Sequence, residues 1–244
     1  MSLAGKRVLI TGGGTGVGAD LARGFAGAGA EVVIAGRREG PLAKVSRGNI
    51  RAVLADVTEE DSVKALFDAA GRCDIVIANA GAADSAPFTD TRLADWNAML
   101  AVNLTGVFLT FREGLSRMDG WGRLIAIAST AGLKGYRYAA PYAAAKHGVV
   151  GLIRSVALEV AKRPVTVNAL CPGFLDTEMT DRSVANIKQK TGMSAGDARK
   201  TLAASNPQKR LIQPAEVTAA ALWLSGPGSE GINGQAIAIA GGEI

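Results

Sequence analysis

The stretch Val8-Leu9-Ile10-Thr11-Gly12-Gly13-Gly14-Thr15-Gly16-Val17-Gly18 decides the fold of this 244-residue chain. It opens with a short apolar run and ends in closely spaced glycines. A helical pattern follows and closes at Gly29, and a second apolar run covers residues 32–35. An apolar strand, a glycine-rich turn, a helix and another strand make one βαβ unit.

The same alternation continues along the chain. Further apolar runs of strand length occur at 53–55, 75–78, 124–128, 165–170 and 235–240. Helical patterns occur at about 92–101, 103–118, 141–162 and 214–225. We also expect a helix after the third strand, with Thr58 as its N-cap and Asp61 three residues on.

Short strands that are apolar throughout and separated by helices are typical of a parallel sheet covered on both faces. We therefore predict one α/β domain over residues 1–244. Its expected architecture is a doubly wound, Rossmann-type sheet of seven parallel strands in a three-layer α/β/α arrangement.

The composition limits the possible functions. Hydrophobic residues make up 48% of the chain, which argues against disorder. Cys73, Cys171 and the single His147 match no metal or redox spacing, so we expect buried free thiols and no metal site. Without a signal peptide or a run of about 18 apolar residues, we expect a cytoplasmic protein with no membrane span. The net charge of +5 has no basic run with interleaved aromatics, which favours an anionic small molecule over nucleic acid.

The glycine-rich turn lies at the carboxyl end of a strand, where ligands of doubly wound sheets bind. Gly12, Gly16 and Gly18 let a pyrophosphate approach the backbone, and the next helix offers free N–H groups. We therefore predict dinucleotide binding. The second strand leads into Arg37 and Arg38, with no acid to accept a hydrogen bond from a ribose 2′-hydroxyl. Because arginine binds phosphate in a bidentate manner, we expect NADP(H), with NAD(H) as the alternative.

Tyr142 and Lys146 stand four residues apart on the helix predicted at 141–162, and such residues share a helix face. A nearby ammonium favours the phenolate and draws the phenol pKa from about 10 toward neutrality. A phenol tuned in this way exchanges protons with a carbonyl or alcohol oxygen. Pairs at this spacing also occur by chance, so the surrounding motifs decide.

Those motifs follow one order along the chain: Thr11-Gly12 to Gly18, Asn79-Ala80-Gly81, Asn103, Ser129, Tyr142 with Lys146, and Pro172-Gly173. Together they resemble the short-chain dehydrogenase/reductase family over essentially the whole chain. Ser129 precedes Tyr142 by the thirteen residues usual in that family.

The resemblance implies four catalytic residues: Asn103, Ser129, Tyr142 and Lys146. Tyr142 would be the general acid in reduction and the base in oxidation. Lys146 would lower the pKa of Tyr142 and bind the nicotinamide ribose, while Ser129 would hold the substrate oxygen. Asn103 would hold a water in a proton relay. Alternatively, Ser129 caps the turn after its strand and Asn103 caps the helix that follows.

The resemblance also implies the cofactor contacts. Asp56 and Val57 would meet the adenine, and Asn79, Ala80 and Gly81 would flank the adenosine ribose. Pro172, Gly173 and Thr177 would face the nicotinamide. The remaining predicted contacts come from the glycine-rich turn, the second strand and the catalytic pair: Gly12, Thr15, Gly16, Val17, Gly18, Arg37, Arg38, Tyr142 and Lys146. Ala78 departs from the family, which often has another Asn before the Asn-Ala-Gly.

The polar segment at about 174–212 is the predicted substrate lid. Between Asp181 and Arg210 it carries seven basic residues against two acids. That excess would favour an anionic substrate, such as an acyl-CoA or a carrier-bound acyl chain, although a solvated helical surface carries similar charge. The sequence around Tyr142 and Cys171-Pro172-Gly173-Phe174 resembles 3-oxoacyl thioester reductases and polyketide ketoreductases. We expect an NADP(H)-dependent enzyme that interconverts a carbonyl and a secondary alcohol, with a 3-oxoacyl thioester as substrate.

Three alternatives stay open. One is an NAD(H)-dependent dehydrogenase of a simple, sugar or cyclic alcohol in a degradative pathway. Another is a catalytically silent nucleotide-binding regulator, against which the four intact catalytic residues argue. Nucleic-acid binding would predict strongly salt-dependent affinity for DNA. The resemblance further implies a homotetramer built through the helices at about 103–118 and 142–162 and through the last strand.

Overall fold

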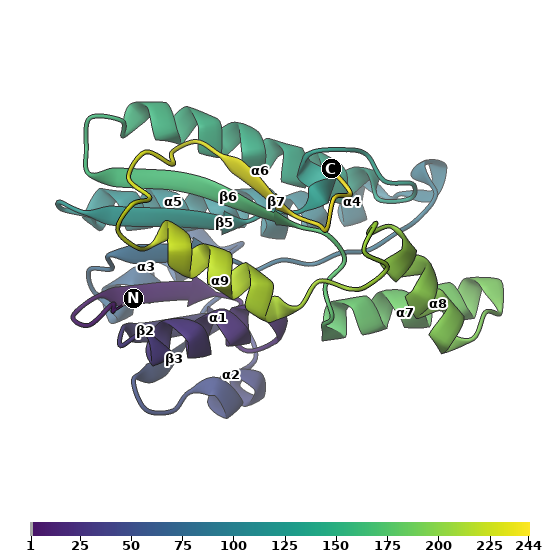
Figure 1. The fold of residues 1–244 in the computed structure, drawn as a ribbon, viewed down its shortest axis with the longest axis horizontal. Helices are drawn as coiled ribbons and strands as arrows, with labels where there is room; N and C mark the ends of the chain where they lie inside the picture. The colour runs from purple at the N-terminus through teal and green to yellow at the C-terminus, as the bar shows by residue number, and fades with distance from the viewer. Residues whose placement is uncertain (1) are drawn as a thin grey trace.

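In a computed structural model that describes residues 2–244, the chain folds around one seven-stranded sheet (Figure 1). All neighbouring strands are parallel, in the order β3-β2-β1-β4-β5-β6-β7. Their bounds are β1 Arg7–Thr11, β2 Glu31–Gly36, β3 Ile50–Leu54, β4 Ile75–Ala78, β5 Gly122–Ile127, β6 Val165–Pro172 and β7 Ala236–Ile239. The order confirms the predicted doubly wound fold, because the strand order reverses between β1 and β4.

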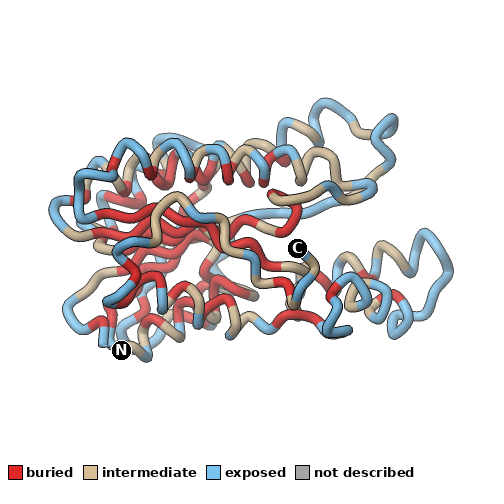
Figure 2. The backbone as a smooth tube through the Cα atoms, turned by 45° about the horizontal axis from the view of Figure 1, so that its top comes forward, coloured by how far each residue is buried: buried red, intermediate tan, exposed pale blue. Residues whose placement is uncertain are grey.

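Helices cover both faces of this sheet, and the buried backbone lies between the two helical layers (Figure 2). One layer consists of α1 (Gly16–Gly27), α2 (Glu39–Val45) and α9 (Pro214–Leu224). The other contains α3 (Glu60–Ala70), α5 (Gly106–Arg117) and α6 (Ala140–Glu159). Alternate residues of one strand serve the two layers, since Ile77 packs on the side of α1 and Val76 on the side of α5.

Two further helices, α7 (Glu178–Thr191) and α8 (Ala195–Ala204), extend to one side of the sheet (Figure 1). They pack on one another and bury little of themselves: only Thr180 and Val184 of α7 and Ala198 of α8 are buried. The polar segment at 174–212 is therefore helical, as its pattern indicated. No helix within residues 2–244 has the length and apolarity needed to cross a membrane.

The predicted helices at 92–101 and 103–118 are continuous rather than separate. α4 (Leu93–Leu100) runs through a π-helical turn, Ala101–Thr105, directly into α5. Asn103 lies inside that turn, so its predicted role as a helix cap is wrong. π-helical turns insert one extra residue and are frequent at functional sites.

Three other local predictions were wrong. α3 begins at Glu60 and receives no cap from Thr58, whose Oγ1 instead donates to Oδ1 of Asp56 at 2.8 Å. The third strand starts at Ile50 rather than 53, because Ile50, Arg51 and Ala52 pair with β2 although the side chains of Arg51 and Ala52 stay exposed at the sheet edge. The short helix α2 was not predicted, since only Leu42 and Val45 of its seven residues are buried.

Candidate active site

The glycine-rich turn and Asn79 meet where β1 and β4 end. Nδ2 of Asn79 donates to the carbonyl oxygens of Thr11 at 2.9 Å and Gly12 at 3.2 Å. The Thr11 hydroxyl accepts from the backbone N–H groups of Asn79 and Ala80, both at 3.1 Å. Asn79 and Thr11 thus tie the two strand ends together, so the Asn79 amide is engaged with the backbone.

This arrangement leaves no room for side chains in the turn. Gly12 has a φ of 67°, and a Cβ there would lie 2.8 Å from Cα of Ala80. A Cβ on Gly18 would collide with the carbonyl oxygen of Gly12. Thr15, the N-cap of α1, makes no side-chain hydrogen bond to the helix, which leaves the first N–H groups of α1 free for an anion. The turn therefore fits a pyrophosphate.

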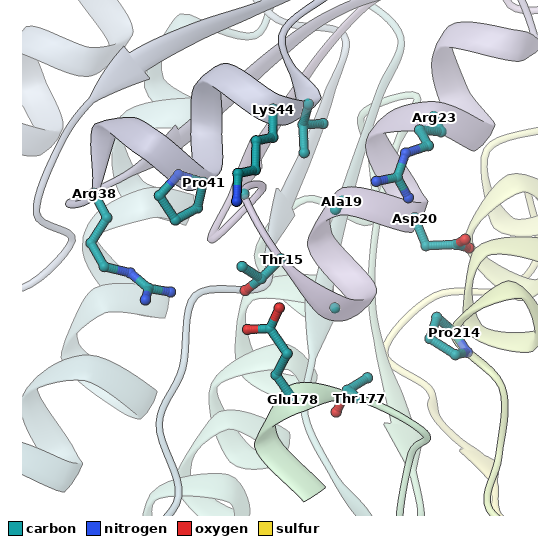
Figure 3. Close-up of a pocket in the computed structure, with 13 residues that line it drawn as sticks. Thr15, Ala19, Asp20, Arg23, Arg38, Pro41, Lys44, Thr177, Glu178 and Pro214 are labelled. Atoms are coloured by element: carbon teal, nitrogen blue, oxygen red, sulfur yellow. The ribbon is translucent and has the colours of Figure 1, made fainter. Parts of the chain in front are cut away.

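A pocket of about 450 Å³ opens beside this turn, between α1, α2 and the start of α7 (Figure 3). Its lining includes the basic side chains Arg23, Arg38 and Lys44. Lys44 and Glu178 point toward Thr15 from opposite sides (Figure 3). None of Ser129, Tyr142 and Lys146 lines the pocket, so it belongs to the turn end of the site.

After the end of β3, the Asp56 carboxylate contacts a hydrogen-bond donor, Thr58, and a positive charge, Arg37. Its carboxylate accepts from the Thr58 backbone N–H at 3.0 Å and lies 3.6 Å from Nη1 of Arg37. Burial acts to raise the pKa of Asp56, but the hydrogen bonds from Thr58 and the charge of Arg37 outweigh it and lower the pKa. Val57 is buried and lies against the first residue of α5. The Arg37 side chain is 70% exposed and reaches Asp56, just beyond the end of β3.

Ser129 follows β5 and starts a single 3₁₀ turn, Thr130–Gly132. Its hydroxyl oxygen accepts from the backbone N–H of Ala131 at 3.1 Å, so Ser129 caps that turn, one of the two roles considered from the sequence. The Ala131 N–H uses only one lone pair of the Ser129 oxygen, so the hydroxyl can still donate its own proton. The cap and a substrate contact are therefore compatible.

Tyr142 and Lys146 lie on the first turns of α6, with the Lys146 Nζ 5.6 Å from the centroid of the Tyr142 ring. Lys146 is only 4% exposed, and Nζ donates to the carbonyl oxygen of Ile127 at 2.9 Å. Burial lowers the pKa of Lys146 to about 8.

The expected lowering of the Tyr142 pKa is wrong in this structure. Burial raises that pKa, and the hydrogen-bonding hydroxyl of Ser129 acts against it without reversing it. The Lys146 ammonium, which donates to the Ile127 carbonyl oxygen, does not reverse the shift either. Tyr142 is therefore a protonated phenol near neutral pH, which suits an acid better than a base.

Asn103 is fully buried and its amide is used within the fold. Nδ2 donates to the carbonyl oxygens of Ala82 at 2.9 Å and Met99 at 3.1 Å, and Oδ1 accepts from the Ala82 N–H at 3.3 Å. A Cβ on Gly81 would lie 2.8 Å from that Oδ1, so the chain after β4 runs close against Asn103. Asn103 fixes this loop; the water relay stays a prediction.

The segment after β6 reaches both ends of the site. Pro172 pairs with Ile239 of β7, and the Gly173 N–H donates to the Ile239 carbonyl oxygen at 3.1 Å. Thr177 is the N-cap of α7, and a Cβ on Gly16 would lie 3.4 Å from its methyl group. Thr177 therefore lies beside the glycine-rich turn.

Three of the seven basic residues counted on the segment at 181–210 form ion pairs, which weakens part of the argument for an anionic substrate. Arg199 forms ion pairs with Asp176 and Asp181, the second at 2.8 Å. Arg210 pairs with Glu216 at 2.7 Å. Asp176 and Glu216 lie outside the counted stretch, so counting within it overstated the excess.

Several polar residues at the site carried no recognisable sequence signal. Tyr136 donates to Glu243 at 2.6 Å and lies 2.7 Å from the Thr130 hydroxyl, in a cluster joined by Lys134. These residues are scattered through a loop and the last residues of the chain, where periodicity says nothing. Within residues 2–244, Cys73 and Cys171 are buried free thiols, which confirms that expectation.

Comparison with known proteins places these features in a family. The model of the family described as short chain dehydrogenase matches residues 6–188. D-beta-hydroxybutyrate dehydrogenase of Rhizobium meliloti is 33% identical over 252 residues, covering 97% of this chain and 98% of the relative. The 3-oxoacyl-(acyl-carrier-protein) reductase FabG of Rickettsia conorii is 31% identical, covering 100% of this chain and 99% of the relative.

A solved structure agrees with these matches. The crystal structure of actinorhodin polyketide ketoreductase with NADPH superimposes with a TM-score of 0.90 at 31% identity, covering 100% of this chain and 99% of that chain. The similarity therefore extends over the whole fold, including α7 and α8.

Proposed function

The chain belongs to the short-chain dehydrogenase family and is an oxidoreductase of carbonyl and alcohol groups; from this premise we propose that it is NADP(H)-dependent and that Ser129, Tyr142 and Lys146 are its catalytic residues. The observation that carries the proposal is that three groups lie together near the end of β5: the Ser129 hydroxyl, the protonated Tyr142 phenol and the buried Lys146 ammonium. In reduction, NADPH supplies the hydride.

Each of the three side chains has one task in the proposed reaction. The Ser129 hydroxyl donates to the substrate oxygen as negative charge develops there. Tyr142 then gives its proton to that oxygen, and its raised pKa keeps the proton in place until then. Lys146, close to the Tyr142 ring, stabilises the phenolate that remains and has donors left for the nicotinamide ribose. The Ile127 carbonyl orients it.

The residues at the turn fit the rest of the cofactor. Gly12, Gly16 and Gly18 would accept the pyrophosphate together with the free N–H groups of α1. Arg38 and Lys44 line the pocket beside the turn, and Arg37 leans over the same strand ends. These cations and the absence of an acid at the end of β2 support NADP(H) over NAD(H). The solved structure of actinorhodin polyketide ketoreductase contains NADPH.

The other predicted contacts are divided between the adenosine half and the nicotinamide half of the cofactor. Thr15, Val17, Asp56, Val57, Asn79, Ala80 and Gly81 would surround the adenosine half, and Pro172, Gly173 and Thr177 the nicotinamide half. We assign Asn103 to the loop at Ala82 and to the proton relay. The whole chain would act as one catalytic domain, with 174–212 as its substrate lid.

For the substrate we propose a 3-oxoacyl thioester. The relative from Rickettsia conorii is a 3-oxoacyl-(acyl-carrier-protein) reductase, and the sequence around Tyr142 resembles such enzymes. A homotetramer is part of the proposal, supported by the exposed Phe108 on α5 and Leu158 on α6, which are 41% and 79% exposed. A partner subunit would cover such side chains.

The test is an assay of ketone reduction with purified protein. The oxidation of NADPH and of NADH would be followed at matched concentrations with 3-oxobutanoyl-CoA and with cyclohexanone. We expect turnover of a ketone, with a higher kcat/KM for NADPH than for NADH. Faster turnover with NADH would contradict the cofactor proposal, and no turnover of 3-oxobutanoyl-CoA would contradict the substrate proposal.

A further inference from the structure

Glu243, the penultimate residue of the chain, has one carboxylate oxygen that the fold does not use. Its side chain is 3% exposed. Oε1 accepts from the Tyr136 hydroxyl at 2.6 Å and forms an ion pair with Lys134 Nζ at 3.0 Å. Oε2 is buried and has no hydrogen-bond partner among residues 2–244. Leaving a buried acceptor unsatisfied is costly, and more so for a charged group. A donor that completes this site would therefore be bound favourably.

The unused oxygen lies against Gly173, the residue that follows β6 and is proposed to face the nicotinamide. The segment after β7 folds back over the end of β6, so that Oε2 lies 3.1 Å from where a Cβ of Gly173 would be. The C-terminal end lies against the segment that follows β5, as Figure 1 shows. Tyr136, which holds Oε1, contacts the hydroxyl of Thr130, the residue after Ser129.

The pKa of Tyr136 reflects its place in this cluster. Burial foremost, then the hydrogen bond to Glu243 and the negative charge that Tyr142 can carry, raise that pKa, and the hydrogen bond with Thr130 acts against them. The Tyr136 ring packs edge-on against Phe174, with centroids 6.1 Å apart. Glu243, Tyr136 and Phe174 thus form one cluster, which contacts the 3₁₀ turn that begins after Ser129.

Anchoring the C-terminal segment would account for the contacts of Glu243 Oε1 but not for the burial of Oε2 without a partner. Oε1, with Tyr136 and Lys134, is sufficient to hold the tail, and the Glu243 N–H already donates to the Ala240 carbonyl oxygen at 3.2 Å. Neither contact gives Oε2 a donor. An apolar side chain at that place would pack without the cost of an unpaired oxygen.

We propose that Glu243 Oε2 accepts a hydrogen bond from a hydroxyl group of the substrate, close to the carbon that is reduced or oxidised. The inference rests on the proposed function, because it takes Tyr142 as the residue that meets the reacting oxygen. It narrows the proposed 3-oxoacyl thioester to one whose acyl chain carries a hydroxyl, and it keeps a sugar or a cyclic hydroxy ketone as the alternative. A plain 3-oxoacyl chain offers no donor at this place, whereas a hydroxylated acyl chain, a sugar or a cyclic hydroxy ketone does.

The test compares ketones that differ by one hydroxyl. The wild-type protein would be assayed with NADPH on two matched pairs: cyclohexanone against 2-hydroxycyclohexanone, and 3-oxobutanoyl-CoA against its 4-hydroxy derivative. In at least one pair we expect kcat/KM to be about 100-fold higher for the hydroxylated compound, because a site built around a hydroxyl rejects the analogue that lacks it. Equal values in both pairs would overturn the inference and leave ketone reduction standing.

Variants then show whether Glu243 is responsible. Glu243→Leu should bring the ratio within a pair close to one, and Glu243→Gln should reduce it by about tenfold, since a neutral amide oxygen is the weaker acceptor. The ratio is independent of how much protein is folded, so a destabilised tail cannot imitate the effect. Glu230→Gln, at an exposed carboxylate elsewhere in the C-terminal part, is the matched control. A preference that survives in Glu243→Leu would contradict the assignment.

Failure of the proposed function is detected separately. If the wild-type protein reduces none of the four ketones, ketone reduction is the proposal that fails. The inference is then judged by equilibrium binding of cyclohexanol and cis-1,2-cyclohexanediol in the presence of NADP⁺. Tighter binding of the diol to the wild-type protein but not to Glu243→Leu supports it, and equal binding contradicts it. An effect of Glu243→Leu on NADP⁺ affinity alone would assign Oε2 to the cofactor instead.

Discussion

The region around Lys146 and the helical segment α7–α8 lie at the same end of the sheet. The first holds a buried positive charge, whereas the second carries exposed charges in ion pairs. Lys146 is 4% exposed and its ammonium is fixed by a single backbone carbonyl at 2.9 Å. On α7–α8, Arg199 and Lys200 lie at the surface, where Asp176 and Asp181 pair with Arg199 and Asp197 pairs with Lys200. Burial changes the chemistry of a side chain, while surface pairing mostly cancels its charge.

Replacement of Tyr142 by phenylalanine tests the buried side of this comparison most strongly. The change removes the proton donor and keeps the ring, so we expect kcat for ketone reduction to fall by about 10³-fold. Tyr138→Phe is the control, because Tyr138 is 61% exposed and outside the proposed machinery. Similar losses in both variants would mean that the difference between buried and exposed tyrosines carries no function.

The sequence was sufficient for the fold because the fold depends on local signals, and the catalytic assignment, which is still a prediction, uses signals of the same kind. Apolar runs mark strands buried on two sides, and the spacing of Ser129, Tyr142 and Lys146 is set by one strand and one helix. α2 and the edge strand β3 were missed or shortened because few of their side chains are buried.

Contacts between distant segments could not be predicted in the same way. Glu243 meets Tyr136 across 107 positions of sequence, and the Arg199 and Arg210 ion pairs depend on how α7, α8 and α9 are packed. The direction of the Tyr142 pKa shift also needed the structure, because it is decided by burial rather than by the four-residue spacing to Lys146. The sequence identifies the residues, and their burial in the folded protein sets the direction of their pKa shifts.

The buried ammonium predicts a pH-dependent stability. Folding lowers the pKa of Lys146 from its ordinary 10.5 to about 8. Between these values the unfolded chain binds one proton more than the folded chain at this residue, so stability rises with pH. We expect the unfolding free energy of the wild type, relative to Lys146→Met, to increase by about 3 kcal/mol from pH 8 to pH 10.5. Urea denaturation at several pH values measures it, and two parallel curves would contradict the burial argument.

Arg37 and Arg38 test an intermediate case, since they are exposed but face the proposed cofactor site. Replacing both by alanine should weaken NADPH binding by about 30-fold and leave NADH binding nearly unchanged, because only NADPH carries the 2′-phosphate. Titration calorimetry with each nucleotide measures the two affinities. Arg47→Ala, an exposed arginine on the same connection, is the control. Equal losses for both nucleotides would assign the arginines to the pyrophosphate or to the fold.

The smallest effect is expected for Arg210, whose ion pair with Glu216 is a surface feature of the segment after α8. Arg210 foremost, and also the Gln213 N–H, lower the pKa of Glu216 to about 2, although burial acts the other way. A lowered carboxyl pKa contributes stability above its ordinary 4.5, and that contribution is lost as the pH falls toward 2.

Because the two side chains are 45% and 35% exposed, solvent screening limits the pair to less than about 1 kcal/mol. We therefore expect Arg210→Gln to lower the unfolding free energy by less than that at pH 7 and to match the wild type near pH 2. Urea denaturation at both pH values measures this, with Lys200→Gln as the control for an arbitrary lost surface cation. A loss of several kcal/mol would mean that this pair is energetically like the buried Lys146, and the contrast between the two regions would then rest on position alone.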